Sequence, residues 1–147
     1  MTGWSQRSLV LTRGRAMVGA REGLEFGRDA QVGSTVLFVE DEVLVRMAVA
    51  EELRRAGFRV IEVANPDQAL DVLAHAFDVK LVLSDIQMPG SMDGLALARL
   101  VRAAYPTIKI VLTSGRSVAG EPDDCDAFFA KPCNAAAMIR HIKALLK

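Results

Sequence analysis

From Ser34 onward, the chain alternates short apolar runs with longer segments of helical periodicity. The run TVLFV at residues 35–39 is rich in β-branched residues, which is typical of a strand buried on both faces. The next segment, residues 42–56, brings its apolar side chains to one stripe, and Gly57 suits the position after a helix end. The stripe comprises Val45, Ala48, Val49, Leu53 and Ala56.

Four more apolar runs follow, and they predict four more strands. They occupy residues 60–63, 81–83, 108–112 and 127–130. The last of these is the shortest. Each run is bounded by polar residues or by glycine and proline, as expected of buried strands.

Three further helices are predicted between and after these strands. Asn65 and Pro66 begin the first as its cap and first residue, and Gln68 completes a capping box. Residues 93–104 form the second helix and end before a proline, and residues 134–146 form the last. In the second helix we expect inward-facing side chains at Leu97, Leu100 and Val101.

Strands that alternate with helices predict an α/β fold. Consecutive parallel strands need crossover connections, so helices should cover both faces of one parallel sheet. Residues 34–147 are enough for a single domain of this kind. No second alternating pattern occurs in the chain.

Residues 1–33 differ from this domain. They hold six of the chain's 11 glycines, carry five arginines against three acids, and sustain no apolar period. We predict that they form a disordered extension, because glycine raises the entropic cost of ordering. A basic arm for an acidic partner is the alternative, and Met17 leaves open that the assigned start lies too early.

Composition and charge argue against several classes of protein. Lys plus Arg and Asp plus Glu number 18 each, and zero net charge argues against direct DNA binding, which needs surplus cations. No apolar run is long enough for a membrane span, and no secretion signal is apparent. The two cysteines, Cys125 and Cys133, are not spaced as a metal pair. These features predict a cytoplasmic protein.

Polar residues gather at the predicted strand ends. Because parallel strands bring their carboxyl ends to one edge of the sheet, they should meet in one cleft. They are Glu40, Asp41, Asp85, Thr113, Ser114 and Lys131. Three carboxylates would repel one another without a cation, and Mg²⁺ prefers such oxygen ligands. Helix capping could explain Glu40 or Asp41 singly, but not the whole set.

Four motifs at these strand ends resemble the receiver domain of two-component response regulators. They are VEDE at residues 39–42, LSDIQMPG at 83–90, LTSG at 112–115 and FAKP at 129–132. The resemblance covers residues 34–147. It implies a flavodoxin-like, doubly wound sheet of five parallel strands in the order 2-1-3-4-5.

The resemblance also implies roles for individual residues. Asp85 would accept a phosphoryl group from a phosphohistidine. Asp41, Asp85 and the backbone carbonyl of Gln87 would bind Mg²⁺ directly, with Glu40 reaching it through water. Lys131 would offset charge on the phosphoryl oxygens during transfer.

The resemblance also implies which residues would respond to phosphorylation. The Thr113 hydroxyl would bond a phosphoryl oxygen and draw its loop inward, and Phe128 would follow that movement. An ordinary half-buried aromatic is the alternative for Phe128. The bond before Pro132 is typically cis in this family. Gln87 and Gly115 would flank the path of an attacking water.

Two departures from the family pattern stand out. The acid pair is Glu40–Asp41, where Asp-Asp is commonest. Residues 117–126 offer no apolar stripe, carry four acids and contain a glycine and a proline. We therefore predict that the fourth helix of the family is shortened or replaced by a loop. That helix belongs to the family's usual output and dimer surface.

The resulting expectation is a single-domain response regulator that signals by protein–protein contact. Its partners would be a sensor histidine kinase or histidine phosphotransfer protein and an unknown downstream protein. It would catalyse only its own phosphotransfer and dephosphorylation, and so is not expected to be an enzyme with a separate substrate. A receiver-like binding module that works without phosphorylation is the alternative. An Asp-nucleophile phosphatase is disfavoured because Gln87 stands where a second acid would be needed. A flavin-binding relative is disfavoured because residues 40–42 would repel phosphate.

Overall fold

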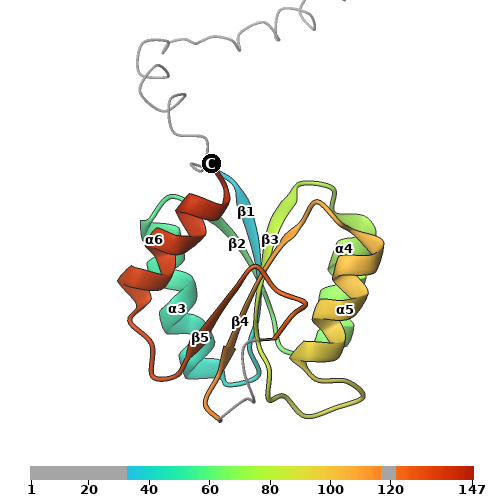
Figure 1. Cartoon of the computed structure of the whole chain (residues 1–147). Helices are drawn as coiled ribbons and strands as arrows, with labels where there is room; N and C mark the ends of the chain where they lie inside the picture. Colours follow the sequence, from blue (N-terminus) through green and yellow to red (C-terminus); the bar gives the residue numbers. More distant parts are fainter. Residues whose placement is uncertain (1–32, 117–121) are drawn as a thin grey trace, which may run out of the picture.

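The computed structural model describes residues 33–116 and 122–147. It has five parallel strands in the order β2-β1-β3-β4-β5 (Figure 1). The strands are β1 (Thr35–Val39), β2 (Arg59–Val63), β3 (Val79–Asp85), β4 (Lys109–Ser114) and β5 (Ala127–Ala130). The α/β class and the strand order are confirmed.

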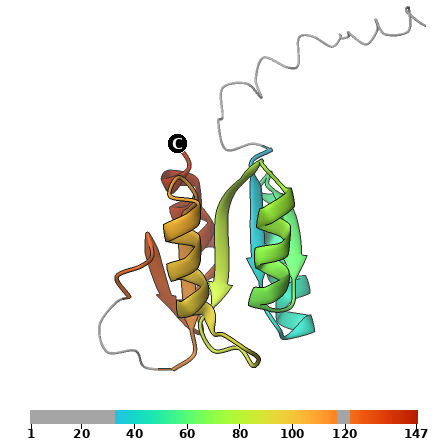
Figure 2. The same ribbon diagram turned by 90° about the vertical axis from the view of Figure 1, so that its right-hand side faces the viewer.

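Helices cover both faces of the sheet. They are α3 (Val43–Arg55), α4 (Pro66–His75), α5 (Gly94–Ala104) and α6 (Ala135–Leu145). In Figure 1, α3 and α6 lie on one side of the sheet and α4 and α5 on the other. Figure 2, turned by 90°, shows α4 and α5 facing the viewer in front of the strands. No helix in the described part of the chain is long and apolar enough to cross a membrane.

Apolar side chains build a core on each face of the sheet. Strand alternation sends Leu37 and Val39 toward α4 and α5, and Val36 and Phe38 toward α3 and α6. β1 is buried along its whole length, as its unbroken apolar run predicts. The sheet is therefore packed on both faces, and its strand ends are left to carry polar groups.

The predicted helix caps are confirmed. Asn65 Oδ1 accepts from the Gln68 backbone N–H at 2.8 Å, and Gln68 Oε1 accepts from the N–H of Ala64 at 2.7 Å. Asn134 caps α6 in the same way. Asp93 lies outside the helix as its cap, accepting from the Ala96 N–H, so α5 begins at Gly94.

Two local predictions are wrong. Ala48 is exposed, whereas Ala50 and Leu53 are the buried residues of α3. Leu100 is 46% exposed, because Leu97, Ala98 and Val101 make the buried stripe of α5. Gly33, the last residue of the predicted extension, donates its N–H to the Gly57 carbonyl. The rest of the extension lies outside the described residues, so its disorder stays a prediction.

The connection between β4 and β5 has no helix in its described residues, 115–116 and 122–126. The prediction that the fourth helix is shortened or replaced is confirmed for these residues. Residues 117–121 lie outside the described part of the chain. Four helices thus accompany the five strands where the chain is described.

Candidate functional site

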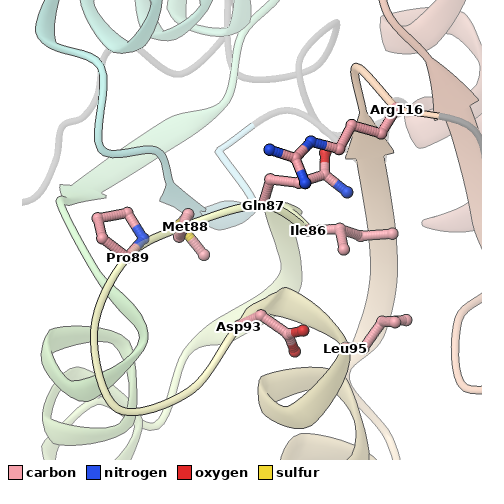
Figure 3. A pocket seen from close by; sticks show the side chains of 7 residues that line it. All are labelled: Ile86, Gln87, Met88, Pro89, Asp93, Leu95 and Arg116. Carbon is pink, nitrogen blue, oxygen red and sulfur yellow. The ribbon is translucent and has the colours of Figure 1, made fainter.

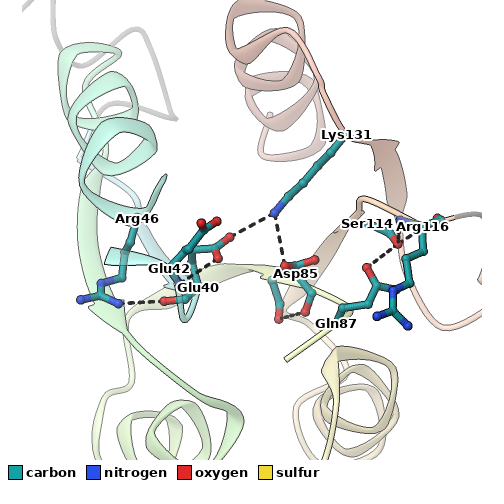
Figure 4. A network of polar contacts seen from close by, with 9 residues as sticks. Glu40, Glu42, Arg46, Asp85, Gln87, Ser114, Arg116 and Lys131 are labelled. Carbon is teal, nitrogen blue, oxygen red and sulfur yellow. Dashed lines mark hydrogen bonds and ion pairs between the residues drawn. The ribbon is translucent and has the colours of Figure 1, made fainter. Parts of the chain in front are cut away.

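Four of the predicted polar residues lie together at the carboxyl edge of the sheet in Figure 4: Glu40, Asp85, Ser114 and Lys131. Glu40 directly follows β1, Asp85 ends β3, and Lys131 directly follows β5. Asp85 is the register partner of Thr113 on β4. Parallel pairing therefore places groups from four strands at one end of the molecule.

Lys131 bridges two buried carboxylates. Its Nζ lies 3.3 Å from Glu40 Oε1 and 3.2 Å from Asp85 Oδ2. Glu40 and Asp85 are 2% and 7% exposed, so this pairing offsets carboxylate charge that is largely withdrawn from water. The Lys131–Pro132 peptide bond is cis, as predicted.

The two oxygens of Asp85 are unequal. Oδ2 has Lys131, whereas Oδ1 is buried and has no hydrogen-bond partner among the described residues. A buried carboxylate oxygen without a partner is costly, and this one lies beside two more acids. One ligand oxygen each from Glu40, Asp41 and Asp85 lie within 4.8 Å of one another.

This donor set fits a hard divalent cation. All of its groups are carboxylates, and the orphaned Asp85 oxygen has no other group to satisfy it. Asp41 is exposed, so the cluster is open to solvent on one side. The residues present therefore suit Mg²⁺.

Burial and nearby charges shift the pKa values of two side chains at the site. Burial raises the pKa of Glu40 above its ordinary value, although the Glu42 backbone N–H and Lys131 both favour its charged form. Burial alone would lower the pKa of Lys131, but attraction to Glu40 and Asp85 outweighs it and raises that pKa. Lys131 is therefore held as a cation next to Asp85.

The backbone after Asp85 is held close to β3 and β4. The Ile86 N–H donates to the Thr113 carbonyl at 2.8 Å, and the Gly94 N–H donates to the Ile86 carbonyl at 2.9 Å. A Cβ at Gly94 would overlap the backbone oxygen of Asp85 and lie 2.8 Å from Ile86 Cα. Glycine at this position allows α5 to begin directly against the site.

The predicted switch residues lie near the site. Thr113 is 7% exposed and lines a small cavity of about 40 Å³ together with Glu40 and Lys131. Phe128 is half-buried against the core on the α5 side of the sheet. Their movement on phosphorylation, and the alternative that Phe128 is only a packing residue, stay untested predictions.

Gln87 makes a hydrogen bond that the sequence did not predict. Gln87 lines a larger pocket of about 650 Å³, and the Arg116 side chain lies next to it there (Figure 3). Gln87 Oε1 accepts a hydrogen bond from Ser114 Oγ at 2.7 Å. Ser114 was placed at a strand end without a role, and no local signal pairs it with a residue 27 positions earlier.

Comparisons with known proteins can now be set beside this geometry. The family model of the response regulator receiver domain matches residues 36–143. The chain belongs to this family. The match includes every predicted site residue of this receiver domain.

Two sequence relatives have similar receiver segments. Sensor kinase CckA of Brucella abortus is 34% identical over 139 residues, which cover 90% of this chain and 15% of CckA. Response regulator protein FleR of Pseudomonas aeruginosa is 34% identical over 114 residues, covering 74% of this chain and 24% of FleR. This receiver domain thus spans less than a quarter of each relative's length.

Solved receiver structures share the fold. Response regulator protein TrrA from Thermotoga maritima, crystallised in complex with Mg²⁺ and BeF, gives a TM-score of 0.71 at 28% identity. That match covers 77% of this chain and 99% of TrrA. The receiver domain of the hybrid histidine kinase CckA gives 0.64 at 31% identity and covers 77% and 99%.

Proposed function

We propose that the protein accepts a phosphoryl group on Asp85 from a phosphohistidine and signals by contact with other proteins. The phosphohistidine would belong to a sensor histidine kinase or a histidine phosphotransfer protein, in keeping with the kinase named among the relatives. The observation that carries the proposal is the state of Asp85. One of its oxygens is paired with Lys131, and the other is buried without a partner beside Glu40 and Asp41.

The proposed transfer has a simple balance. A carboxylate oxygen of Asp85 forms a bond to phosphorus, and the bond from phosphorus to the histidine nitrogen breaks. That nitrogen keeps the electron pair. The lysine at 3.2 Å from Asp85 Oδ2 would remain protonated and face the phosphoryl oxygens.

Mg²⁺ is the cofactor we propose. Asp41, Asp85 and the Gln87 backbone carbonyl would hold it directly, and Glu40 through water. When bound, the ion would offset the combined charge of the carboxylates and the phosphoryl oxygens. The related TrrA structure contains Mg²⁺ with BeF, which supports this assignment.

The remaining parts of the proposal concern the response. Thr113 would bond a phosphoryl oxygen, and Phe128 would follow through packing alone, since it lacks a hydroxyl. The affinity for a downstream protein would then shift with phosphorylation. The chain would act only on its own Asp85 and on no separate substrate.

The test is labelling with acetyl phosphate and Mg²⁺, read as a mass increase of one phosphoryl group. We expect labelling of the wild type and none of Asp85→Ala. Asp71→Ala is the matched control, because the Asp71 side chain is 80% exposed on α4. Equal labelling of wild type and Asp85→Ala would refute the site. No labelling of either would favour a binding module that works without phosphorylation.

A further inference from the structure

The side chain of Gln87 is turned away from the carboxylates and toward β4 (Figure 4). Its Oε1 accepts from Ser114 Oγ at 2.7 Å. The Ser114 side chain is almost fully buried, with 1% of the residue exposed, and its Oγ also accepts from the Arg116 N–H at 3.1 Å. Oγ further lies 3.0 Å from the Arg116 carbonyl, a longer contact than the one to Gln87. The serine is thus fixed in place and holds the glutamine.

Gln87 has the chemistry to act at a phosphorylated Asp85. It is two residues from Asp85 and half-buried beside the open pocket. A glutamine carboxamide can orient a water that attacks phosphorus. The carboxamide oxygen that would accept from such a water accepts from Ser114 instead, and this bond turns the carboxamide toward β4. The next residue of β4's loop, Gly115, has no side chain that could take this role.

We propose that the Ser114 hydroxyl is a positioning group that holds Gln87 away from the phosphoryl group and so prolongs the phosphorylated state. This inference rests on the proposed function of Asp85. In the step that is slowed, a water oxygen bonds to phosphorus and the bond from phosphorus to the Asp85 oxygen breaks. The Asp85 carboxylate keeps the electron pair, and the proton of the water leaves with the phosphate or to solvent.

The test is the lifetime of the phosphoryl group after loading with acetyl phosphate and Mg²⁺ and removing the donor. Ser114→Ala should shorten the lifetime about fivefold, because losing one hydrogen bond frees the carboxamide. Ser84→Ala is the matched control. Ser84 is equally buried, at 0% exposure, but its hydroxyl contacts the Asp85 carbonyl and not Gln87. The phosphoryl lifetime of Ser84→Ala should match that of the wild type.

A second set of variants, built on Gln87→Met, separates positioning of the Gln87 carboxamide from a general loss of structure. Gln87→Met keeps the side-chain length and the backbone carbonyl but removes the carboxamide. In that background, adding Ser114→Ala should leave the lifetime unchanged. An unchanged lifetime in Ser114→Ala alone, or an equal shortening in both backgrounds, would overturn the inference. A wild type that takes no label would instead refute the proposed function, and the inference with it.

Discussion

The two connections on either side of β4 pack against the rest of the domain in different ways. The connection from β3 to β4 contains α5, which buries Leu97, Ala98 and Val101 against the sheet. The connection from β4 to β5 has no helix in residues 115–116 and 122–126. There, Asp124 and Asp126 form ion pairs with arginines of α5.

Asp126 is the centre of this polar connection. Its Oδ2 accepts from the Arg102 guanidinium at 3.0 Å and from the Ile110 N–H at 2.8 Å. Its own N–H donates to the Ile110 carbonyl at 2.7 Å. A second pair, Arg99 with Asp124 at 3.2 Å, joins the same helix to the same connection. β5 is therefore anchored through α5 and β4.

The difference teaches that the two connections support the site in different ways. The β3–β4 connection supplies the loop after Asp85 and the close approach of Gly94. The β4–β5 connection holds the strand that leads to Lys131.

The largest expected effect is on the apolar connection. Leu97→Ala should lower the free energy of unfolding by about 3 kcal/mol, because it removes a fully buried side chain and leaves a cavity. The measurement is urea unfolding followed by circular dichroism. Leu100→Ala, in the same helix but 46% exposed, is the matched control and should cost under about 1 kcal/mol. Similar losses in the two variants would contradict the packing described for α5.

A smaller loss is expected when the close approach at the site is disturbed. Gly94→Ala should cost about 2 kcal/mol, because its Cβ would overlap the Asp85 backbone oxygen. It should also reduce labelling by acetyl phosphate. Gly115→Ala belongs to the other connection, where a Cβ would meet nothing within 4 Å. If both variants unfold at the same urea concentration, the two connections do not differ as we describe.

Substitutions in the polar β4–β5 connection should lower the free energy of unfolding least. Asp126→Ala should cost about 1.5 kcal/mol, because the Ile110 N–H and Arg102 lose their shared acceptor. Asp124→Ala, whose pair with Arg99 is more exposed, should cost under about 0.5 kcal/mol. Thermal unfolding of both variants checks the order. A greater loss in Asp124→Ala would show that Asp126 is not the anchor.

Much of this molecule could be predicted from its sequence. Strand and helix periodicity are local, so the order of elements and the caps at Asn65 and Asn134 followed from short segments. The convergence of Glu40, Asp85 and Lys131 followed from one rule, that parallel strands end at a common edge. The errors at Ala48 and Leu100 arose because a helical stripe can be assigned one position too wide.

By itself, then, the sequence determined the class of fold and the groups at the site, because both depend on periodicity and on strand order. Only the tertiary structure decided how those groups are partnered. The unpaired Asp85 oxygen, the Ser114–Gln87 bond and the Asp126 anchor each depend on distances between segments far apart in the chain. Such distances are set by strand register and by packing between helix and sheet, which no short run of residues encodes.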